Sequence, residues 1–366
     1  MRITARILAL LLTGCCAFAT QALDYRVETL AKGLEFPWSL AFLPDGRMLV
    51  TERAGRLRVI ADGKLLPDAI GGLPPIYVSG QAGLFEVLPD PDFARNQLLF
   101  LSFAHGNSRA NHTRIVRARL DGNALKEVTP IFTVKPAKQG DAHFGARMAW
   151  LGDGTLVMGT GDGFNYREKA QKLDNHLGKI IRIRKDGLVP EDNPFVNDKK
   201  ALPEIYSLGH RNVQGLFFDV QTGKLYAHEH GPRGGDEVNL IEPGRNYGWP
   251  LITYGVDYSG AIISPFTEKP GLEQPLLYWV PSIAPAGMTL YRGALFPQWN
   301  GNLLVSALAG QKVQRIELNN GKVGQQFVLF GELGTRLRDI RTGPDGAIYM
   351  LTDKAFGRVL KVVPRT

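Results

Sequence analysis

Apolar residues in this chain occur as short runs that come in pairs, and in five of the six pairs a turn containing glycine separates the two runs. Six such pairs follow one another, at residues 39–50, 83–101, 148–157, 215–226, 288–305 and 340–349. Short apolar runs are typical of strands, and glycine supplies the positive φ angle that a tight turn requires. Each pair therefore predicts two short strands joined by a turn.

The six pairs recur at an irregular spacing of roughly 45 to 75 residues, slightly longer than the usual period of a propeller blade. We therefore expect an all-β fold, a six-bladed β-propeller with long inter-strand loops around a central site. A propeller gathers the loops of all its blades around one channel, so functional side chains are expected there. No linker interrupts the repeats, and residues 23–366 are expected to form one domain, with a helical turn within residues 165–177.

The first 22 residues have the composition of a secretory signal peptide. Arg2 and Arg6 precede an apolar run over residues 7–12, and Thr20 to Ala22 offer small residues for cleavage. The apolar run is too short to span a membrane stably. We therefore expect a protein without a membrane span that is exported to the periplasm or secreted.

An alternative for this segment is a lipid anchor. The sequence Leu12-Thr13-Gly14-Cys15 fits the cleavage pattern of bacterial lipoproteins, with Cys15 as the anchored residue. Both cysteines of the chain, Cys15 and Cys16, lie in this segment. A chain cleaved after Ala22 would contain no cysteine, so it could form no disulfide.

The formal net charge is +8 at pH 7, and it becomes +6 when Arg2 and Arg6 leave with the signal segment. No dense run of lysine and arginine exists, and no motif combines basic with aromatic residues, so a nucleic-acid partner is not expected. An ordinary basic surface accounts for this charge. The alternative is that several arginines line a site for an anionic ligand.

Polar clusters interrupt the strand pattern next to the predicted strand pairs, where a propeller places ligand-binding loops. Gln81 lies close to glycines that would let the backbone approach a flat ligand. His143 precedes a strand and, with an ordinary pKa of about 6.5, is a candidate general base. Arg211 offers a planar fork for a carboxylate or a quinone oxygen. Taken singly, each of these residues could instead be structural, as part of a turn or as a hydrogen-bonded core histidine.

Two further clusters combine charges with glycines. Residues 228–239 contain carboxylates, glycines and exposed carbonyls, which suit calcium. The spacing of His228 and His230 leaves zinc as an alternative, although zinc requires a third protein ligand. A strand would point Arg336 and Arg338 to the same side. These two cations, close to Asp339, could clamp a polyanion or form a solvated edge with salt bridges.

Together these motifs resemble the soluble pyrroloquinoline-quinone (PQQ)-dependent sugar dehydrogenases, the glucose/sorbosone dehydrogenase family, and within it the bacterial periplasmic aldose sugar dehydrogenases. The likeness extends over nearly all of the processed chain, in residues 36–42, 80–84, 143–147, 192–195, 209–215, 229–239, 246–250 and 338–346. The family fold is a six-bladed propeller with a central cofactor site. The resemblance implies an oxidoreductase that oxidises aldose sugars at C1 to lactones by hydride transfer to PQQ. Calcium would bind at the cofactor, and an external electron acceptor, which no motif identifies, would reoxidise it.

The resemblance also assigns roles to residues. It implies that His143 is the general base for the anomeric hydroxyl of the sugar. Residues expected to bind the cofactor are Gln81, Arg211, Asn212, Tyr258, Ala307, Leu308, Ala309, Arg336, Leu337 and Arg338. The calcium on the cofactor is expected at the backbone carbonyls of Gly231 and Pro232. A second, structural calcium is expected at Glu237 and Tyr247.

Three positions depart from the family pattern. Relatives often place a lysine against the cofactor where this chain has Ala309, so we expect either weaker cofactor binding or a substitute role for Lys312. The glucose-type enzymes carry an aspartate beside the base where this chain has Ala142, with Asp141 one residue earlier, which favours the aldose type. Val213 stands where proline is usual, which we expect to be a mild change.

Two other functions fit parts of the pattern. A calcium-dependent lactonase-type hydrolase on a similar propeller needs calcium and a base, but it needs no arginine pair for a tricarboxylate. A noncatalytic sugar-binding propeller would not need His143, Arg211 and the calcium motif together. The combination of base, arginines and calcium motif therefore favours the dehydrogenase.

Overall fold

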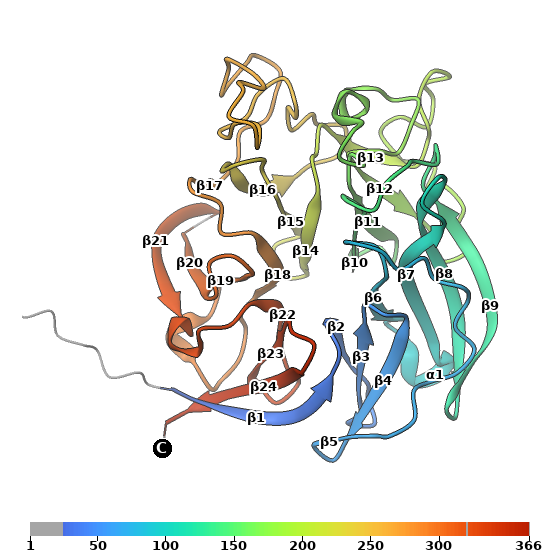
Figure 1. Cartoon of the computed structure of the whole chain (residues 1–366), viewed down its shortest axis with the longest axis vertical. Helices are drawn as coiled ribbons and strands as arrows, with labels where there is room; N and C mark the ends of the chain where they lie inside the picture. Colours follow the sequence, from blue (N-terminus) through green and yellow to red (C-terminus); the bar gives the residue numbers. More distant parts are fainter. Residues whose placement is uncertain (1–24, 320, 366) are drawn as a thin grey trace, which may run out of the picture.

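The computed structural model describes residues 25–319 and 321–365, and its elements are almost all β-strands. They form six four-stranded sheets arranged as a ring around a common axis (Figure 1). The all-β, six-bladed propeller expected from the repeats is therefore confirmed. The predicted signal peptide (residues 1–22) and the alternative anchor at Cys15 lie outside the described residues. Within the described ranges, the model contains no helix long and apolar enough to cross a membrane.

We number the blades 1 to 6 in the chain order of their innermost strands. Blade 1 consists of β2 (Pro37–Phe42), β3 (Met48–Glu52), β4 (Arg56–Ala61) and β5 (Lys64–Leu65). Blade 2 consists of β6 (Leu84–Pro89), β7 (Leu98–Gly106), β8 (Asn111–Asp121) and β9 (Ala124–Thr133). Blade 3 consists of β10 (Gly145–Trp150), β11 (Leu156–Thr160), β12 (Lys179–Ile183) and β13 (Ile205–Leu208). Blade 4 consists of β14 (Val213–Asp219), β15 (Lys224–Glu229), β16 (Asp236–Ile241) and β17 (Leu277–Trp279). Blade 5 consists of β18 (Pro285–Leu290), β19 (Leu303–Ala307), β20 (Val313–Asn319) and β21 (Lys322–Leu329). Blade 6 consists of β22 (Leu337–Thr342), β23 (Ile348–Thr352), β24 (Gly357–Pro364) and β1 (Tyr25–Leu34).

Short helices occur only in the connections. They are α1 (Phe93–Asn96) and the single 3₁₀ turns η1 (Arg167–Gln171), η2 (Pro297–Trp299) and η3 (Gly331–Leu333). The turn η1 is the helical turn expected within residues 165–177. In blade 2, α1 lies in the connection between the two inner strands.

The paired apolar runs form the two innermost strands of each blade, as predicted. These strands read as continuous apolar runs because both faces of an inner strand are covered by neighbouring blades. Every residue of β11 and of β23, for example, is buried. Leu49 of blade 1 and Leu101 of blade 2 belong to one hydrophobic cluster between adjacent blades.

The ring is closed within blade 6 by strands from both ends of the chain. The strand β1 pairs antiparallel with β24, from Tyr25 opposite Pro364 to Leu34 opposite Gly357. The N-terminal strand is thus the outermost strand of the sheet that the C-terminal strands build. Ring closure therefore depends on both ends of the chain.

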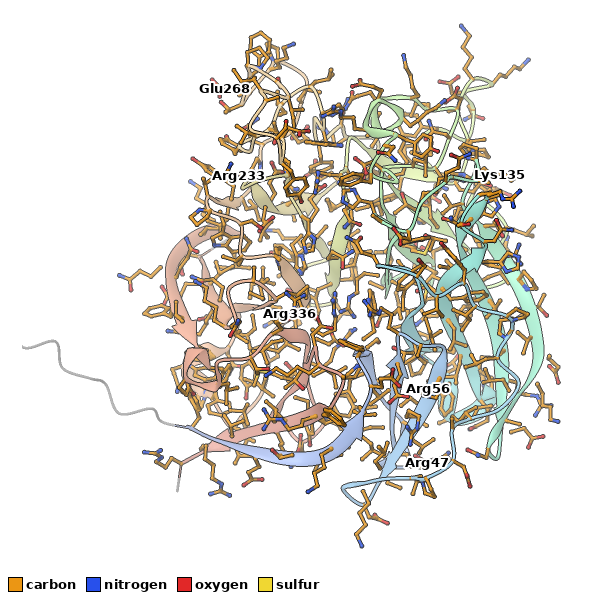
Figure 2. The ribbon with its side chains drawn as sticks, viewed as in Figure 1. Arg47, Arg56, Lys135, Arg233, Glu268 and Arg336 are labelled. Atoms are coloured by element: carbon orange, nitrogen blue, oxygen red, sulfur yellow. The ribbon has the colours of Figure 1, made fainter. Side chains whose placement is uncertain are left out.

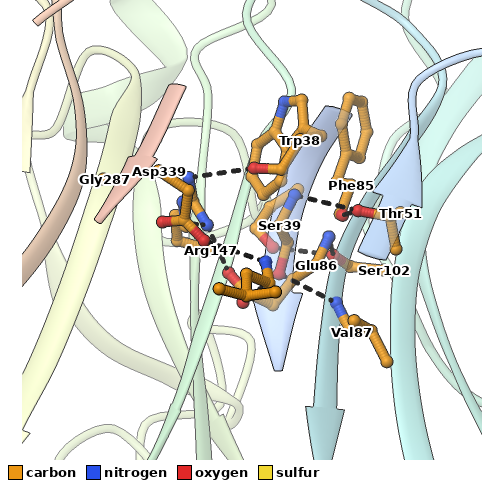
Figure 3. A network of polar contacts seen from close by, with 12 residues as sticks. Trp38, Ser39, Thr51, Phe85, Glu86, Val87, Ser102, Arg147, Gly287 and Asp339 are labelled. Atoms are coloured by element: carbon orange, nitrogen blue, oxygen red, sulfur yellow. Dashed lines mark hydrogen bonds and ion pairs between the residues drawn. The ribbon is translucent and has the colours of Figure 1, made fainter. Parts of the chain in front are cut away.

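The guanidinium of Arg147 on β10 occupies the propeller axis and contacts several blades (Figure 3). Its Nη1 lies 3.0 Å from Glu86 Oε2 of blade 2 and 3.2 Å from Asp339 Oδ1 of blade 6. It also donates hydrogen bonds to the backbone carbonyls of Trp38 in blade 1 and Gln214 in blade 4. Arg147 is therefore part of an axial network and not a partner of His143.

Two other residues complete this axial network. Arg341 on β22 bonds Glu86 at 2.6 Å and Asp339 at 3.0 Å, so each carboxylate faces two guanidinium groups. In blade 5, Gly287 leaves room for Asp339, because a Cβ atom at this glycine would collide with the Asp339 carboxylate. All six blades thus meet around one buried cluster of paired charges.

In every blade, the innermost strand begins and the second strand ends at the same face of the propeller. We call this face the site face. Two long connections reach it, residues 161–178 between β11 and β12 and residues 242–276 between β16 and β17. The indole Nε1 of Trp249 in the second connection donates to Asp162 Oδ2 in the first at 2.8 Å. The two connections are therefore tied together beside the axis.

Candidate active site

A cavity of about 440 Å³ opens on the axis at the site face, and we call it the central cavity. It is lined by the starts of inner strands and by residues that follow second strands. The lining residues are Phe36, Trp38, Arg53, Gln81, Phe85, Phe144, Gly145, Asn212, Gln214, His230, Ala284, Leu308, Arg336, Arg338 and Asp353. The structure thus brings together Gln81, Asn212, Leu308, Arg336 and Arg338, which were predicted to bind one cofactor. Figure 2 labels Arg336 near the middle of the ring.

A second cavity of about 280 Å³, the side cavity, lies under the two long connections. Its lining residues are Asp162, Phe164, Asn165, Arg167, Arg211, Pro232, Trp249, Asp257, Tyr258 and Ile263. Three of the predicted site residues, Arg211, Pro232 and Tyr258, lie here and not in the central cavity. Since Arg211 and Asn212 are consecutive, the two cavities are adjacent at this point of blade 4.

His143 connects the two cavities through its partners. Its backbone N–H donates to Gln81 Oε1 at 2.9 Å, and Gln81 lines the central cavity. Its Nδ1 lies 2.7 Å from Asp162 Oδ1, and Asp162 lines the side cavity. Because an ionised carboxylate only accepts hydrogen bonds, Nδ1 carries the proton and Nε2 keeps a free lone pair. The histidine therefore has the tautomer that a general base needs.

Burial lowers the pKa of His143 below its ordinary value. The hydrogen bond that His143 donates to Asp162 opposes this shift, whereas the nearby charges of Arg211 and Lys138 add to it. Burial alone would raise the pKa of Asp162, but its hydrogen bond to His143 and the positive charges around it leave the pKa lowered. At neutral pH the pair is therefore a neutral imidazole held by an ionised carboxylate.

The backbone of His143 is in the left-handed region, with φ of +53°, which is uncommon for a residue with a side chain. Neighbouring glycines make this conformation possible, since a Cβ atom at Gly161 would collide with the His143 carbonyl. Strained backbone of this kind clusters at functional sites, where the surrounding structure holds it in place.

Asp162 is the residue that sequence reasoning missed here. Asp141 and Ala142 were considered as neighbours of the base, but Asp141 accepts a hydrogen bond from the Ser79 hydroxyl and does not touch the His143 ring. A signal for Asp162 existed in the sequence Gly161-Asp162-Gly163, which directly follows a second strand. The second strand of blade 4, β15, is likewise followed by a polar residue and a glycine, His230 and Gly231.

Arg336 and Arg338 form a cationic wall on the blade 6 side of the central cavity. Both bond the same carboxylate, Asp353, at 3.0 and 3.2 Å. Their predicted neighbour Asp339 is instead part of the axial network. The Nε of Arg338 is buried without a hydrogen-bond partner, so this wall holds an unused donor.

The opposite side of the site is formed by Arg211 in blade 4. Its Nη1 donates to the carbonyls of His230 and Gly231, and its side chain lies over the rings of Trp249 and Tyr258 at 5.2 and 5.9 Å. Its Nε is also buried without a partner. Each of the two adjacent cavities therefore has a guanidinium with an unsatisfied donor, Arg338 at the central cavity and Arg211 at the side cavity.

Two buried carboxylates face each other beneath Arg211. Glu229 on β15 and Glu237 on β16 are directly opposite in the sheet register. Burial, together with the charge of Glu229, raises the pKa of Glu237 to about 8. Asn239 Nδ2 bridges the two carboxylates at 3.4 Å, while its Oδ1 is buried without a partner. Glu229 also accepts hydrogen bonds from His210 Nδ1 and from the Arg211 backbone N–H. The several oxygen atoms of this pair are the type of ligand that calcium prefers.

The other residues predicted as metal ligands differ in which of their atoms are free to bind a metal. The Tyr247 hydroxyl donates to Leu240 O and accepts from Glu242 N, so only its backbone carbonyl is left for a metal. Among the described residues, no three His, Cys, Asp or Glu side chains converge on one point. His228 is fully buried in blade 4 and His230 bonds Pro285 O at 2.7 Å. The zinc alternative therefore has no third ligand in this part of the chain.

Comparison with known proteins agrees with this geometry. The family described as Glucose / Sorbosone dehydrogenase matches residues 34–361. The chain belongs to this family. Its members include enzymes named as dehydrogenases, and the chain is accordingly an oxidoreductase.

Three relatives of this family member are informative. The aldose sugar dehydrogenase YliI of Escherichia coli strain K12 is 41% identical over 345 residues, covering 93% of each chain. A crystal structure of the soluble aldose sugar dehydrogenase (Asd) from Escherichia coli in the apo-form has a TM-score of 0.90 at 40% identity, covering 93% of this chain and 100% of that chain. The PQQ-bound form of aldose sugar dehydrogenase (Adh) from Streptomyces coelicolor has a TM-score of 0.76 at 28% identity, with coverages of 92% and 98%.

Three residues that the family resemblance suggests as cofactor contacts, Ala307, Ala309 and Leu337, line neither the central nor the side cavity of this dehydrogenase. Leu337 packs into the hydrophobic core beside blade 5, because successive strand residues point to opposite sides. Ala307 is buried and Ala309 is exposed, and only Leu308 between them lines the central cavity. Lys312 lines neither cavity, so it does not replace the lysine of the relatives.

Proposed function

We propose that this protein is a PQQ-dependent aldose sugar dehydrogenase that oxidises the sugar at C1 to a lactone. The observation that carries the proposal is the arrangement of the site, with an arginine wall at the central cavity and a buried His143–Asp162 pair that links this cavity, through Gln81, to the side cavity. The Streptomyces coelicolor relative, which has the same fold, is named as PQQ-bound. The proposed substrates are aldoses, and the electron acceptor is an external molecule of unspecified identity.

The central cavity suits a planar, polyanionic quinone. Trp38, Phe85 and Phe144 form one aromatic cluster at its wall. The ring centroids are 5.3 Å apart between Trp38 and Phe85, and 5.7 Å apart between Phe85 and Phe144. Aromatic faces of this kind accept a flat conjugated ligand. The unused Nε donors of Arg338 and Arg211 would bond oxygen atoms at the two ends of such a ligand.

His143 is the proposed general base. Bound PQQ supplies the electrophilic quinone that accepts the hydride from C1 of the sugar. His143 Nε2 would take the proton of the anomeric hydroxyl, and Asp162 would stabilise the imidazolium that forms. Gln81 fixes the backbone of His143, and Arg211 would bind the quinone end of the cofactor. A lowered histidine pKa keeps this base free of a proton at neutral pH.

Calcium is proposed at two places. The carbonyls of Gly231 and Pro232 would hold one ion at the cofactor, where its positive charge favours hydride acceptance. Glu237, the carbonyl of Tyr247 and the facing Glu229 would hold a structural ion. We also propose that residues 1–22 direct export to the periplasm or secretion, with a lipid anchor at Cys15 as the alternative.

The test of the proposed function is reconstitution. The protein freed of ligands is given calcium and PQQ, and reduction of an electron-acceptor dye is followed with a panel of aldoses. Activity that requires both additions is expected, with the lactone as product. If PQQ does not bind, the proposal fails, and a lactonase assay with calcium alone then tests the hydrolase alternative.

Replacing Asp162 with asparagine is expected to lower kcat by about 10- to 100-fold, as for other residues that orient a reacting histidine. Asp162 accepts bonds from three donors, His143 Nδ1, Phe164 N and Trp249 Nε1, so an asparagine must turn its NH₂ toward one of them. Loss of the carboxylate also removes a contact that raises the His143 pKa. The acid limb of the kcat/KM profile should therefore move to lower pH, and an unchanged profile would contradict the assignment.

Calcium is expected to raise the Tm of the calcium-free protein by several degrees. An ion present at a concentration of a hundred times its Kd stabilises the folded state by about 2.7 kcal/mol. Replacing Glu237 with glutamine should remove most of this shift, since one of the two facing carboxylates is lost. Glu28→Gln, on the half-exposed outer strand β1, is the matched control. A Glu237→Gln protein that keeps the full calcium shift would place the structural ion elsewhere.

A further inference from the structure

Arg53 lines the central cavity but was not among the residues predicted from the sequence. It directly follows β3 in blade 1, the neighbour of the blade that carries Arg336 and Arg338. Its Nη1 donates to the carbonyl of Gly80 at 3.0 Å, and its guanidinium lies 4.9 Å from the centre of the Phe36 ring. A third guanidinium thus stands on the cationic side of the cavity.

The charges around Arg53 are not balanced within the protein. Arg336 and Arg338 share Asp353, which is the only carboxylate among the residues that line the central cavity. Within the described residues, Arg53 has no carboxylate oxygen within the 4.0 Å that defines an ion pair, and its only side-chain hydrogen bond is to a neutral carbonyl. Three guanidinium groups therefore face one carboxylate, which leaves this wall with an excess of positive charge.

The position of Arg53 is also fixed by the backbone. Its N–H donates to Phe36 O and its carbonyl accepts from Leu84 N, both at 3.1 Å. Gly83 makes room for its stem, because a Cβ atom at this glycine would lie 2.5 Å from Arg53 Cγ. The backbone and stem of Arg53 are thus fixed beside the cavity, and its guanidinium reaches the Gly80 carbonyl there.

A structural role would be to cover Phe36 and to satisfy the Gly80 carbonyl. The Gly80 contact does not require a full positive charge, since a neutral amide could donate the same hydrogen bond, whereas the Phe36 contact gains from the charge. An unpaired cation beside two others is instead what a ligand with several carboxylates would neutralise. The three guanidinium groups line the central cavity and Arg211 lines the adjacent side cavity, which fits a ligand whose acidic and reacting ends differ.

We propose that Arg53 binds a carboxylate of the tricarboxylate cofactor, as a third cationic contact beside Arg336 and Arg338. This inference rests on the proposed function. It also explains how the chain could hold the cofactor although Ala309 stands where relatives often have a lysine and Lys312 does not reach the cavity.

The test measures cofactor binding directly, by calorimetric titration of PQQ into ligand-free protein at constant calcium. The variants are Arg53→Gln, which keeps a donor without charge, and Arg53→Lys, which keeps the charge without the fork. Arg47→Gln is the matched control, since Arg47 pairs with Asp45 in the exposed turn between β2 and β3. Arg53→Gln should raise the Kd for PQQ by about 10- to 100-fold, in the range of a charge-assisted hydrogen bond. Arg53→Lys should raise it less, and Arg47→Gln should leave it unchanged.

The PQQ trimethyl ester, which lacks the carboxylate charges, provides the second arm. Wild-type and Arg53→Gln proteins should bind this ester with equal affinity, which separates charge recognition from packing. If the wild-type protein binds PQQ and Arg53→Gln binds it equally well, while Arg336→Gln does not, the role of Arg53 is overturned and the proposed function stands. If the wild-type protein does not bind PQQ at all, the proposed function fails and the inference fails with it.

Discussion

Replacing His143 with alanine is expected to lower kcat for aldose oxidation by about 10²- to 10⁴-fold while PQQ binding stays largely unchanged. The imidazole is the group that would take the anomeric proton, and its Nδ1 is already committed to Asp162 at 2.7 Å. Water cannot replace it efficiently, because the site is buried and His143 is only 4% exposed. The measurement is steady-state turnover of the reconstituted enzyme, together with a direct PQQ titration.

The control for this variant is His105→Ala, because His105 lies on β7 and lines neither cavity. It should leave turnover unchanged. Turnover of His143→Ala equal to that of the control would remove His143 from the mechanism. Loss of PQQ binding together with turnover would instead make His143 a cofactor contact whose effect on the proton step is indirect.

Replacing Arg147 with methionine is expected to lower the free energy of unfolding by about 3–5 kcal/mol. The substitution keeps the methylene chain but removes the charge that Glu86 and Asp339 share, and both carboxylates are only 1% exposed. It also leaves the carbonyls of Trp38 and Gln214 without their donor. Urea unfolding, followed by tryptophan fluorescence, measures the change.

Arg95→Met provides the comparison for Arg147. Arg95 forms an exposed ion pair with Asp92, and such pairs contribute at most about 1 kcal/mol. Arg147→Met should therefore unfold at a clearly lower urea concentration than Arg95→Met. Equal midpoints for the two variants would mean that Arg341 alone compensates Glu86 and Asp339, and that the axial network does not depend on Arg147.

The sequence could predict the hairpins because their signals are local. A glycine turn between two apolar runs determines strand, turn and strand together, and burial of both faces follows from the continuous apolar composition. The common direction of Arg336 and Arg338 follows equally from strand alternation. The same alternation directs the side chain of Leu337, which stands between the two arginines, to the opposite side of the strand and away from the cavity.

Partners that come from the ends of different strands could not be predicted in this way. Asp162 meets His143 because two neighbouring connections in blade 3 converge, and Asp353 meets both arginines because β23 ends where β22 begins. Glu229 faces Glu237 through a strand register that the sequence does not state. Arg53 was overlooked because the sequence around it resembles an ordinary hairpin turn, and only the shape of the cavity shows which way it faces.

The pairing of β1 with β24 determines when the ring can be completed during folding. The first strand has no partner until the last strand has been synthesised, so the blade that closes the ring joins residues from opposite ends of the chain. Contacts this distant in sequence form slowly, because ordering the intervening chain has an entropic cost. Blades 1 to 5 can form in succession as the chain emerges, whereas the central cavity, which needs Arg336 and Arg338 beside Arg53, is assembled last. A polypeptide that lacks either terminal strand would thus lose a complete binding site and not merely one strand of one sheet.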